Sequence, residues 1–102
     1  MRHITVEELK ARMDAGEELN IIDVREDYER ADFNIGGTHL KLGNIQAMAI
    51  DEIQDLKDKE VIIYCRSGNR SQVAAHILDQ LGFKNTVNVS GGMLDWVGKF
   101  GR

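Results

Sequence analysis

Residues 61–71 read Val-Ile-Ile-Tyr-Cys-Arg-Ser-Gly-Asn-Arg-Ser, and they predict a strand, a short loop and the start of a helix. The first four residues are apolar and mostly β-branched, which is typical of a buried strand. From Ser71 onward, apolar residues recur at helical spacing as far as Leu81, and Gly82 is a suitable helix stop. A buried strand joined to a helix by a short loop is the unit from which parallel sheets are built.

The rest of the chain continues this alternation of strands and helices. Thr5 and Glu8 have the spacing of a capping box, so a helix is predicted from there to Gly16. We therefore expect residues 1–102 to form a single α/β domain, with a central parallel sheet of about five strands and helices on both faces. The other predicted strands are 19–24, 39–42 and 86–89, and the other predicted helices are about 26–32, 45–56 with Asn44 as N-cap, and 92–97.

The loop after Tyr64 carries the candidate chemistry, because ligand sites in such sheets lie at the carboxyl ends of the strands. The first amides of a helix lack intrahelical partners, so a loop that curls into the helix aims its N–H groups at one point. Gly68 permits this curl because glycine tolerates positive φ. Cys65 lies at the mouth of the resulting anion-binding nest. Amides, the helix dipole and nearby arginines are expected to lower the pKa of its thiol.

This loop predicts a nucleophile and an anion cradle in one segment. A lone cysteine at a strand end is more often an inert core residue. Two arginines, a glycine, an asparagine and two serines in the next six positions favour the catalytic interpretation. The candidate catalytic residue is Cys65, and the candidate substrate-binding residues are Arg66, Ser67, Gly68, Asn69, Arg70 and Ser71.

Composition excludes several classes of protein. The chain has 102 residues, one cysteine, no proline and a formal net charge of −4. One thiol can form neither an internal disulfide nor, by itself, a zinc site, so a disulfide-stabilised secreted domain is excluded and a reducing, cytoplasmic compartment is expected. The acidic balance disfavours nucleic-acid binding. No targeting segment is visible, and no apolar run approaches the roughly 20 residues of a membrane span, so no membrane association is expected.

The charge is distributed unevenly along the chain. Residues 7–32 hold ten acidic and four basic residues, which is typical of a solvated face. Residues 61–78 hold no acidic residue and include Arg66 and Arg70. A cationic segment in an acidic protein indicates an anion site rather than a general polyanion surface.

Four motifs, which follow one another along the chain, resemble those of the rhodanese (thiosulfate sulfurtransferase) family, in particular its small single-domain type. The segment 65–71 is similar to the family's active-site loop, and the resemblance spans nearly the whole chain. Where the family often has Gly-His-Ile-Pro-Gly-Ala, residues 33–38 read Phe-Asn-Ile-Gly-Gly-Thr, so the His and the Pro are missing. The other motifs are Ile21 to Arg25 with Glu29, Ile35 to Thr38, and Gly82-Phe83 through Val87 followed by Gly91-Gly92-Met93 and Trp96.

The resemblance implies a rhodanese-like fold and a double-displacement reaction through a cysteine persulfide. The Cys65 thiolate would attack the outer sulfur of thiosulfate, and sulfite would leave. The amides of residues 66–71 would stabilise the anionic persulfide, while Arg66 and Arg70 would attract the substrate anions. No cofactor or metal is implied. The implied partners are thiosulfate or another sulfane-sulfur donor, and an external acceptor such as cyanide, a cellular thiol or a thioredoxin-like dithiol.

Two alternatives remain beside sulfur transfer from thiosulfate. Cysteine-dependent phosphatases and arsenate reductases share the architecture, but the phosphatase pattern places Arg six positions after Cys. Here Arg70 is five positions after Cys65, which makes a tighter cradle, and Tyr64 stands where that pattern has His. The other alternative is a non-catalytic or partner-loaded sulfur-carrier module, with which an intact Cys65 is fully compatible.

Several other residues near the predicted site have either a functional or a purely structural interpretation. Asp23 and Arg25 at a neighbouring strand end are predicted either to orient the Cys65 loop or to form a structural ion pair with neighbours such as Glu29. Met93 is placed near the pocket edge, and Trp96 is expected in the core. The three histidines, His3, His39 and His76, lack metal-ligand spacing with the thiol and are expected to have no catalytic role.

Overall fold

Five parallel strands form one sheet in the order β1-β5-β4-β2-β3 in the computed structural model, which describes residues 1–102. β4 lies at the centre between β5 and β2, and its residues are buried except the first. The strands are β1 (Arg2–Ile4), β2 (Ile21–Asp23), β3 (Thr38–His39), β4 (Glu60–Tyr64) and β5 (Asn85–Val89).

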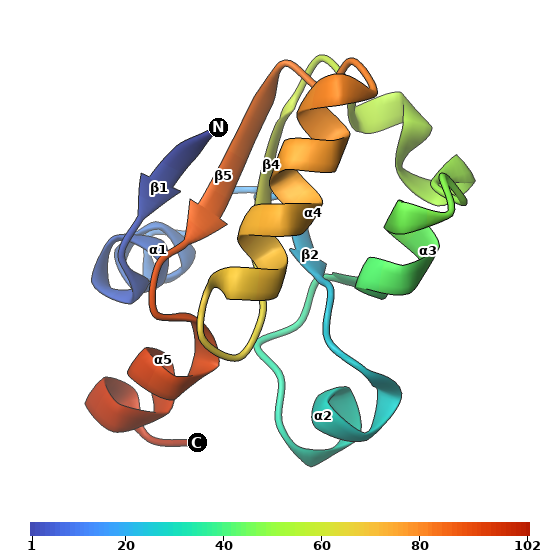
Figure 1. The fold of residues 1–102 in the computed structure, drawn as a ribbon. Coiled ribbons are helices and arrows are strands. Elements are labelled where there is room, and N and C mark those ends of the chain that lie inside the picture. Colours follow the sequence, from blue (N-terminus) through green and yellow to red (C-terminus); the bar gives the residue numbers. More distant parts are fainter.

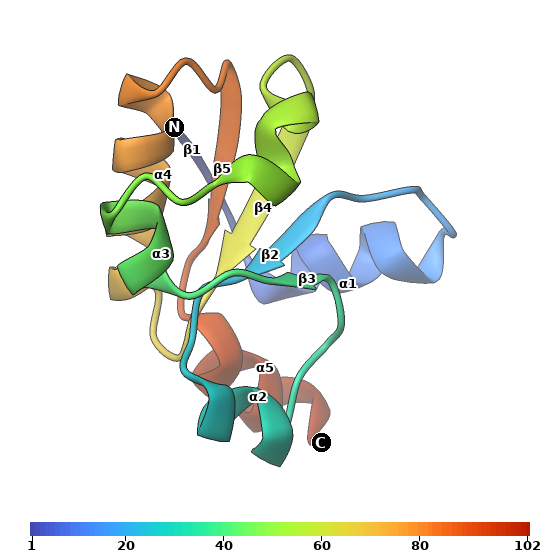
Figure 2. The ribbon, with the colours of Figure 1, turned by 90° about the vertical axis from the view of Figure 1, so that its right-hand side faces the viewer.

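Helices cover both faces of this sheet, as Figures 1 and 2 show from two sides. The α3, η1 and α4 segments lie on one face, α1 lies on the other, and α2 and α5 lie near the carboxyl ends of the strands. The predicted α/β architecture is therefore confirmed. The helices are α1 (Val6–Asp14), α2 (Asp27–Asp32), α3 (Leu42–Gln46), α4 (Asn69–Gln80) and α5 (Gly92–Phe100), with a 3₁₀ helix η1 (Asp51–Leu56).

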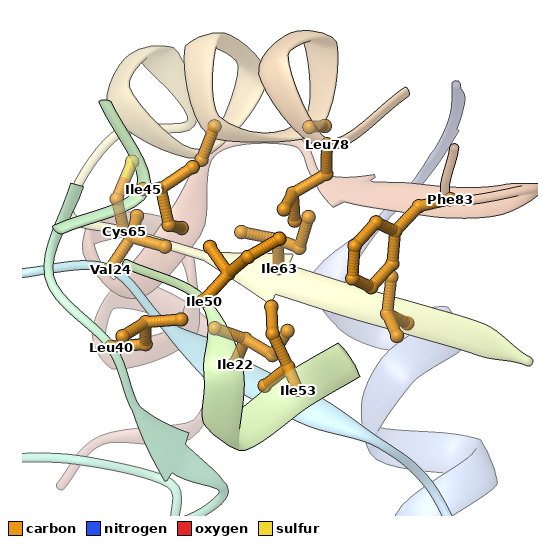
Figure 3. Close-up of a cluster of buried hydrophobic side chains, with 13 residues drawn as sticks. Ile22, Val24, Leu40, Ile45, Ile50, Ile53, Ile63, Cys65, Leu78 and Phe83 are labelled. Atoms are coloured by element: carbon orange, nitrogen blue, oxygen red, sulfur yellow. The ribbon is translucent and has the colours of Figure 1, made fainter. Parts of the chain in front are cut away.

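Successive side chains of β4 enter opposite halves of the core, as the two-residue period of a strand requires. Val61, Ile63 and Cys65 belong to a cluster of 13 buried residues under α3, η1 and α4 (Figure 3). Ile62 and Tyr64 belong to a second cluster of 10 buried residues under α1 and α5. Cys65 thus lies in the chain where the apolar core ends and the loop begins.

The local sequence signal for α1 predicted its start correctly. The capping box at α1 is formed, with the Glu8 amide donating to the Thr5 hydroxyl and the Thr5 amide donating to the Glu8 carboxylate. The longest helix, α4, has 12 residues, and no helix combines the length and apolar character that crossing a bilayer takes.

Three predictions about elements were wrong, and one strand was not predicted. The predicted helix 45–56 is two short segments, α3 and η1, separated by a break in which Met48 has a φ of 59°. Lys41, not Asn44, is the N-cap of α3. The predicted strand 39–42 is displaced, because β3 covers only Thr38–His39 and α3 already begins at Leu42. Strand β1 was missed, since three residues with the burial pattern exposed, exposed, buried give no strand periodicity.

Candidate active site

The loop between β4 and α4 curls around the Cys65 sulfur. Gly68 precedes α4 with a φ of 97°, in the left-handed region that its missing side chain permits. This turn places the Gly68 and Ser71 amides 3.1 and 3.3 Å from Sγ of Cys65, and both donate to it. The Ser71 hydroxyl lies 3.3 Å from the same sulfur. The predicted convergence of N–H groups on the thiol is therefore present.

Helix α5 holds the loop from the opposite side. The Met93 amide donates to the Cys65 carbonyl, and the Leu94 amide donates to the Arg66 carbonyl, both at 2.9 Å. This approach requires Gly92, because a Cβ there would lie 2.5 Å from the Cys65 carbonyl oxygen. The carbonyls of Cys65 and Arg66 therefore face α5. The amides of Gly68 and Ser71, further along the loop, face the sulfur. Gly92, which the sequence indicated only as part of a motif, is thus a positioning residue.

The Cys65 thiol is buried, with 0% of the residue exposed. Burial raises the pKa of this thiol, while hydrogen bonds that its thiolate form can accept from the Ser71 hydroxyl and from the Ser71, Gly68 and Ser67 amides lower it. The hydrogen bonds prevail, and the pKa of Cys65 lies below its ordinary value. Since the thiolate is the nucleophilic form, this arrangement favours nucleophilic chemistry at Cys65.

The two loop arginines have different surroundings. Arg70 donates two hydrogen bonds to the Glu29 carboxylate of α2, at 2.6 and 2.7 Å. Arg66 is exposed and lines a pocket of about 400 Å³ between α2 and α5. Of the two arginines, Arg66 is therefore the one whose guanidinium is open to an incoming anion, while Arg70 ties the loop to α2. Ser67 and Asn69 are exposed, and Gly68 and Ser71 are buried.

The ion pair with Arg70 favours the ionised form of the Glu29 carboxyl group. Its hydrogen bond from Arg70 is the largest influence and lowers the pKa of Glu29 to about 2. The same carboxylate accepts the Glu26 amide at 3.0 Å, at the start of α2. The sequence named Glu29 as part of a motif and as a possible ion-pair neighbour of Asp23 and Arg25, whereas its hydrogen-bond partner Arg70 is 41 residues away along the chain.

We expect the Glu29–Arg70 pair to make stability depend on pH. A depressed carboxyl pKa contributes stability that is present above the unfolded-state value of about 4.3 and is lost as pH falls toward 2. Allowing for solvent screening, this loss is about 1–2 kcal/mol. Urea unfolding of wild type and Glu29→Gln between pH 5 and 2 measures it: the variant should lose that part of the pH slope. Glu18→Gln, at an exposed site, is the control and should retain the wild-type slope.

Asp23 and Arg25 form a buried ion pair beside the loop. The Arg25 guanidinium donates two hydrogen bonds to Asp23, both at 2.9 Å, and Arg25 is 4% exposed. The Tyr64 hydroxyl also donates to Asp23, at 3.0 Å. Burial raises the pKa of Asp23, and these bonds more than offset it, so its pKa lies below the ordinary value. Asp23 and Arg25 thus form a structural ion pair with each other. Glu29, which was named as a possible neighbour of this pair, hydrogen-bonds to Arg70 instead.

The remaining candidates have mostly structural surroundings. Met93 lines the pocket between α2 and α5, and Trp96 belongs to the buried cluster under α1 and α5, as expected for both. His39 contacts the Arg25 carbonyl at 2.7 Å, and His76 lies 3.5 Å from Gln80. No group of three or more His, Cys, Asp or Glu side chains is arranged to hold a metal ion.

Comparisons with known proteins find relatives that match nearly the whole chain. A model of the rhodanese-like domain matches residues 5–99. The Bacillus subtilis protein named "Putative sulfurtransferase YtwF" is 44% identical over 101 residues, covering 97% of this chain and 93% of that protein. "Putative sulfur carrier protein YrkF" of the same organism is 42% identical, and the chain spans 51% of its length. The crystal structure of a rhodanese-like domain protein from Staphylococcus aureus superposes with a TM-score of 0.82 at 30% identity, over 94% of this chain and 91% of that one.

Proposed function

This chain belongs to the rhodanese-like domain family, and from that premise we propose that it is a sulfurtransferase that carries sulfane sulfur as a persulfide on Cys65. One observation carries the proposal most directly. The only cysteine of the chain is held by two amides and a hydroxyl, all within 3.3 Å of its sulfur. Relatives named for sulfur transfer and for sulfur carriage support the same chemistry.

In the first step the Cys65 thiolate attacks the outer sulfur of thiosulfate. A new S–S bond forms at Cys65, the S–S bond of thiosulfate breaks, and sulfite leaves with the electron pair of that bond. Cys65 then carries one extra sulfur atom. The amides that face the sulfur would stabilise the persulfide anion, since they are already oriented before the reaction begins. Arg66, which lines the pocket, would draw the substrate dianion toward the loop.

In the second step an external acceptor takes the sulfur. A thiolate or cyanide attacks the outer persulfide sulfur, the bond to Cys65 breaks, and the Cys65 thiolate is restored. Because the chain has one cysteine, no second thiol of the same chain can resolve the persulfide. We propose an acceptor thiol or dithiol outside residues 1–102, such as a thioredoxin-like protein. We also propose that these residues act as one catalytic domain in a reducing, cytoplasmic compartment.

We assign roles to the loop residues within this proposal. Cys65 is the nucleophile, and Arg66 and the amides of the loop bind the anion. Arg70 acts mainly by holding the loop against α2 through Glu29. Asp23 and Arg25 bind each other at the end of β2, and Asp23 also accepts from Tyr64, the residue before Cys65. The substrate-binding set remains Arg66, Ser67, Gly68, Asn69, Arg70 and Ser71.

Intact-mass spectrometry under non-reducing conditions tests the proposal. After incubation with thiosulfate and desalting, the protein should gain the mass of one sulfur atom, and added cyanide should remove it. Sulfate is the control, because it is a tetrahedral dianion without a sulfane sulfur and should leave the mass unchanged. An unchanged mass with both thiosulfate and a low-molecular-weight persulfide would refute sulfur loading at this site.

A sulfur carrier loaded by a partner is the second candidate, and the name of YrkF favours it. The same mass measurement separates the two functions. A carrier would remain unloaded with thiosulfate and gain sulfur when a cysteine desulfurase and cysteine are supplied. A thiosulfate sulfurtransferase would load from thiosulfate alone.

A further inference from the structure

A chain of hydrogen bonds leads from the Cys65 thiol to the edge of the sheet. Sγ of Cys65 lies 3.3 Å from Oγ of Ser71, which donates to Oδ1 of Asn88 at 2.5 Å. Nδ2 of Asn88 lies 3.2 Å from Nδ1 of His3. The sheet register brings the last two together, since His3 on β1 is directly opposite Asn88 on β5. Asn88 is 2% exposed and His3 is exposed, so the chain connects a buried thiol with the surface.

The number of protons available to these hydrogen bonds limits which group donates and which accepts. An amide oxygen only accepts, so with Oδ1 of Asn88 facing Ser71 the single hydroxyl proton of Ser71 is donated to Asn88. Oγ of Ser71 then has no proton left for the sulfur and can only accept one from it. This direction fits Cys65 as a thiol. The Asn88 NH₂ group in turn donates to Nδ1 of His3, which must be unprotonated.

A thiolate at Cys65 requires the opposite direction. The sulfur becomes an acceptor, so the Ser71 hydroxyl turns its proton toward Sγ. Oγ of Ser71 would then face Oδ1 of Asn88 as two acceptors at hydrogen-bonding distance, which is repulsive. A half-turn of the Asn88 amide removes this conflict: the NH₂ group donates to Ser71, and Oδ1 accepts from Nδ1–H of His3.

We propose that Ser71, Asn88 and His3 form a relay that reverses its hydrogen-bond direction when Cys65 loses its proton, with Asn88 as the rotating element. The relay rests on the proposed function in one respect, because the thiolate it stabilises is the nucleophile of that function. The thiol proton passes to solvent, and no net charge moves along the relay. Asn88 and His3 are therefore positioning residues, and a protonated His3 favours the thiolate.

The charged and titratable groups around the relay have other partners. On α4, Asp79 pairs with the amino group of Met1 and accepts the Thr86 hydroxyl, and His76 contacts Gln80. On β1, Arg2 pairs with Glu60. Near the thiol, Arg70 is bound to Glu29. His3 is thus the titratable group in direct hydrogen-bond connection with Asn88.

A double-mutant cycle on the alkylation rate of Cys65 tests the relay. Iodoacetamide reacts with the thiolate, so its rate as a function of pH reports the ionisation of the single cysteine. The carboxylate of Asn88→Asp can only accept from Ser71, so it keeps the hydrogen-bond direction that fits the protonated thiol. It should raise the apparent pKa of Cys65 by about one unit and slow alkylation about tenfold below that pKa. In a Ser71→Ala background the same substitution should have less than about a third of this effect, because no hydroxyl transmits it. Equal effects in both backgrounds would overturn the relay, since a carboxylate acting through space does not need Ser71.

His3 allows an independent test at an exposed site, where folding is not at risk even if Asn88→Asp fails to fold. In wild type the alkylation profile should deviate from a single titration, because a proton on Nδ1 of His3 favours the thiolate. His3→Gln should remove this deviation, and the control His76→Gln should keep it. A His3→Gln profile identical to wild type would overturn the relay. Alkylation needs no sulfur donor, so these results stand apart from the thiosulfate mass test, and either idea can fail without the other.

Discussion

Replacement of Cys65 by serine is expected to abolish sulfur loading completely. The hydroxyl of serine is a far weaker nucleophile than a thiolate, and the chain has no second cysteine to substitute for it. Serine retains an acceptor for the Gly68 and Ser71 amides, so the loop should keep its curl. Intact mass after incubation with thiosulfate should be unchanged for Cys65→Ser, while wild type gains one sulfur atom.

The thermal unfolding midpoint is the control for this experiment. A midpoint within a few degrees of wild type would show that the missing sulfur reflects lost chemistry rather than lost structure. Cys65→Ala provides a further comparison, because it leaves two buried amides without their acceptor and should be less stable than Cys65→Ser. A Cys65→Ser protein that still gains sulfur would disprove the assignment of the nucleophile.

Replacement of Asp23 by asparagine is expected to give the largest loss of stability. Asp23 is 0% exposed and neutralises Arg25, which is 4% exposed. Removing one partner leaves a buried charge uncompensated, which costs about 3–5 kcal/mol. That is a large part of the roughly 5–15 kcal/mol by which a domain of this size is stable. Urea unfolding at pH 7 should therefore show a markedly lower midpoint.

Asp27→Asn is the matched control for Asp23→Asn. Asp27 pairs with Lys41 at 3.3 Å, but its side chain is 77% exposed, so the change should stay within about 0.5 kcal/mol. Equal midpoints for the two variants would show that the buried pair does not stabilise the fold.

The rhodanese-like fold was predictable because its strongest signals are local, and the family was predictable because four motifs occur in order along the chain. The apolar residues 61–64, the glycine of the loop and the apolar spacing of α4 all lie within one short segment. The curl around Cys65 followed from the needs of helix amides and from the tolerance of Gly68 for positive φ. These features depend on neighbours in the sequence, so the sequence alone specifies them.

The contacts that complete the candidate site were not predictable, because they depend on tertiary packing. Arg70 meets Glu29, and Ser71 meets Asn88, only after the helices have packed on the sheet. The helical spacing of residues 45–56 also misled, since apolar residues at that spacing equally fit two short segments around the bend at Met48. Strand β1 is recognised as a strand only through its pairing with β5.

The position of β5 has a consequence for the order in which the molecule assembles during synthesis. β1 pairs only with β5, although more than 80 residues separate Ile4 from Val89. Among the five strands of this sheet, the first to be synthesised therefore has no partner until the last has emerged. The amides of α5 that hold the Cys65 and Arg66 carbonyls emerge later still. The two backbone bonds that fix the carbonyl side of the Cys65 loop therefore form only after α5 has docked.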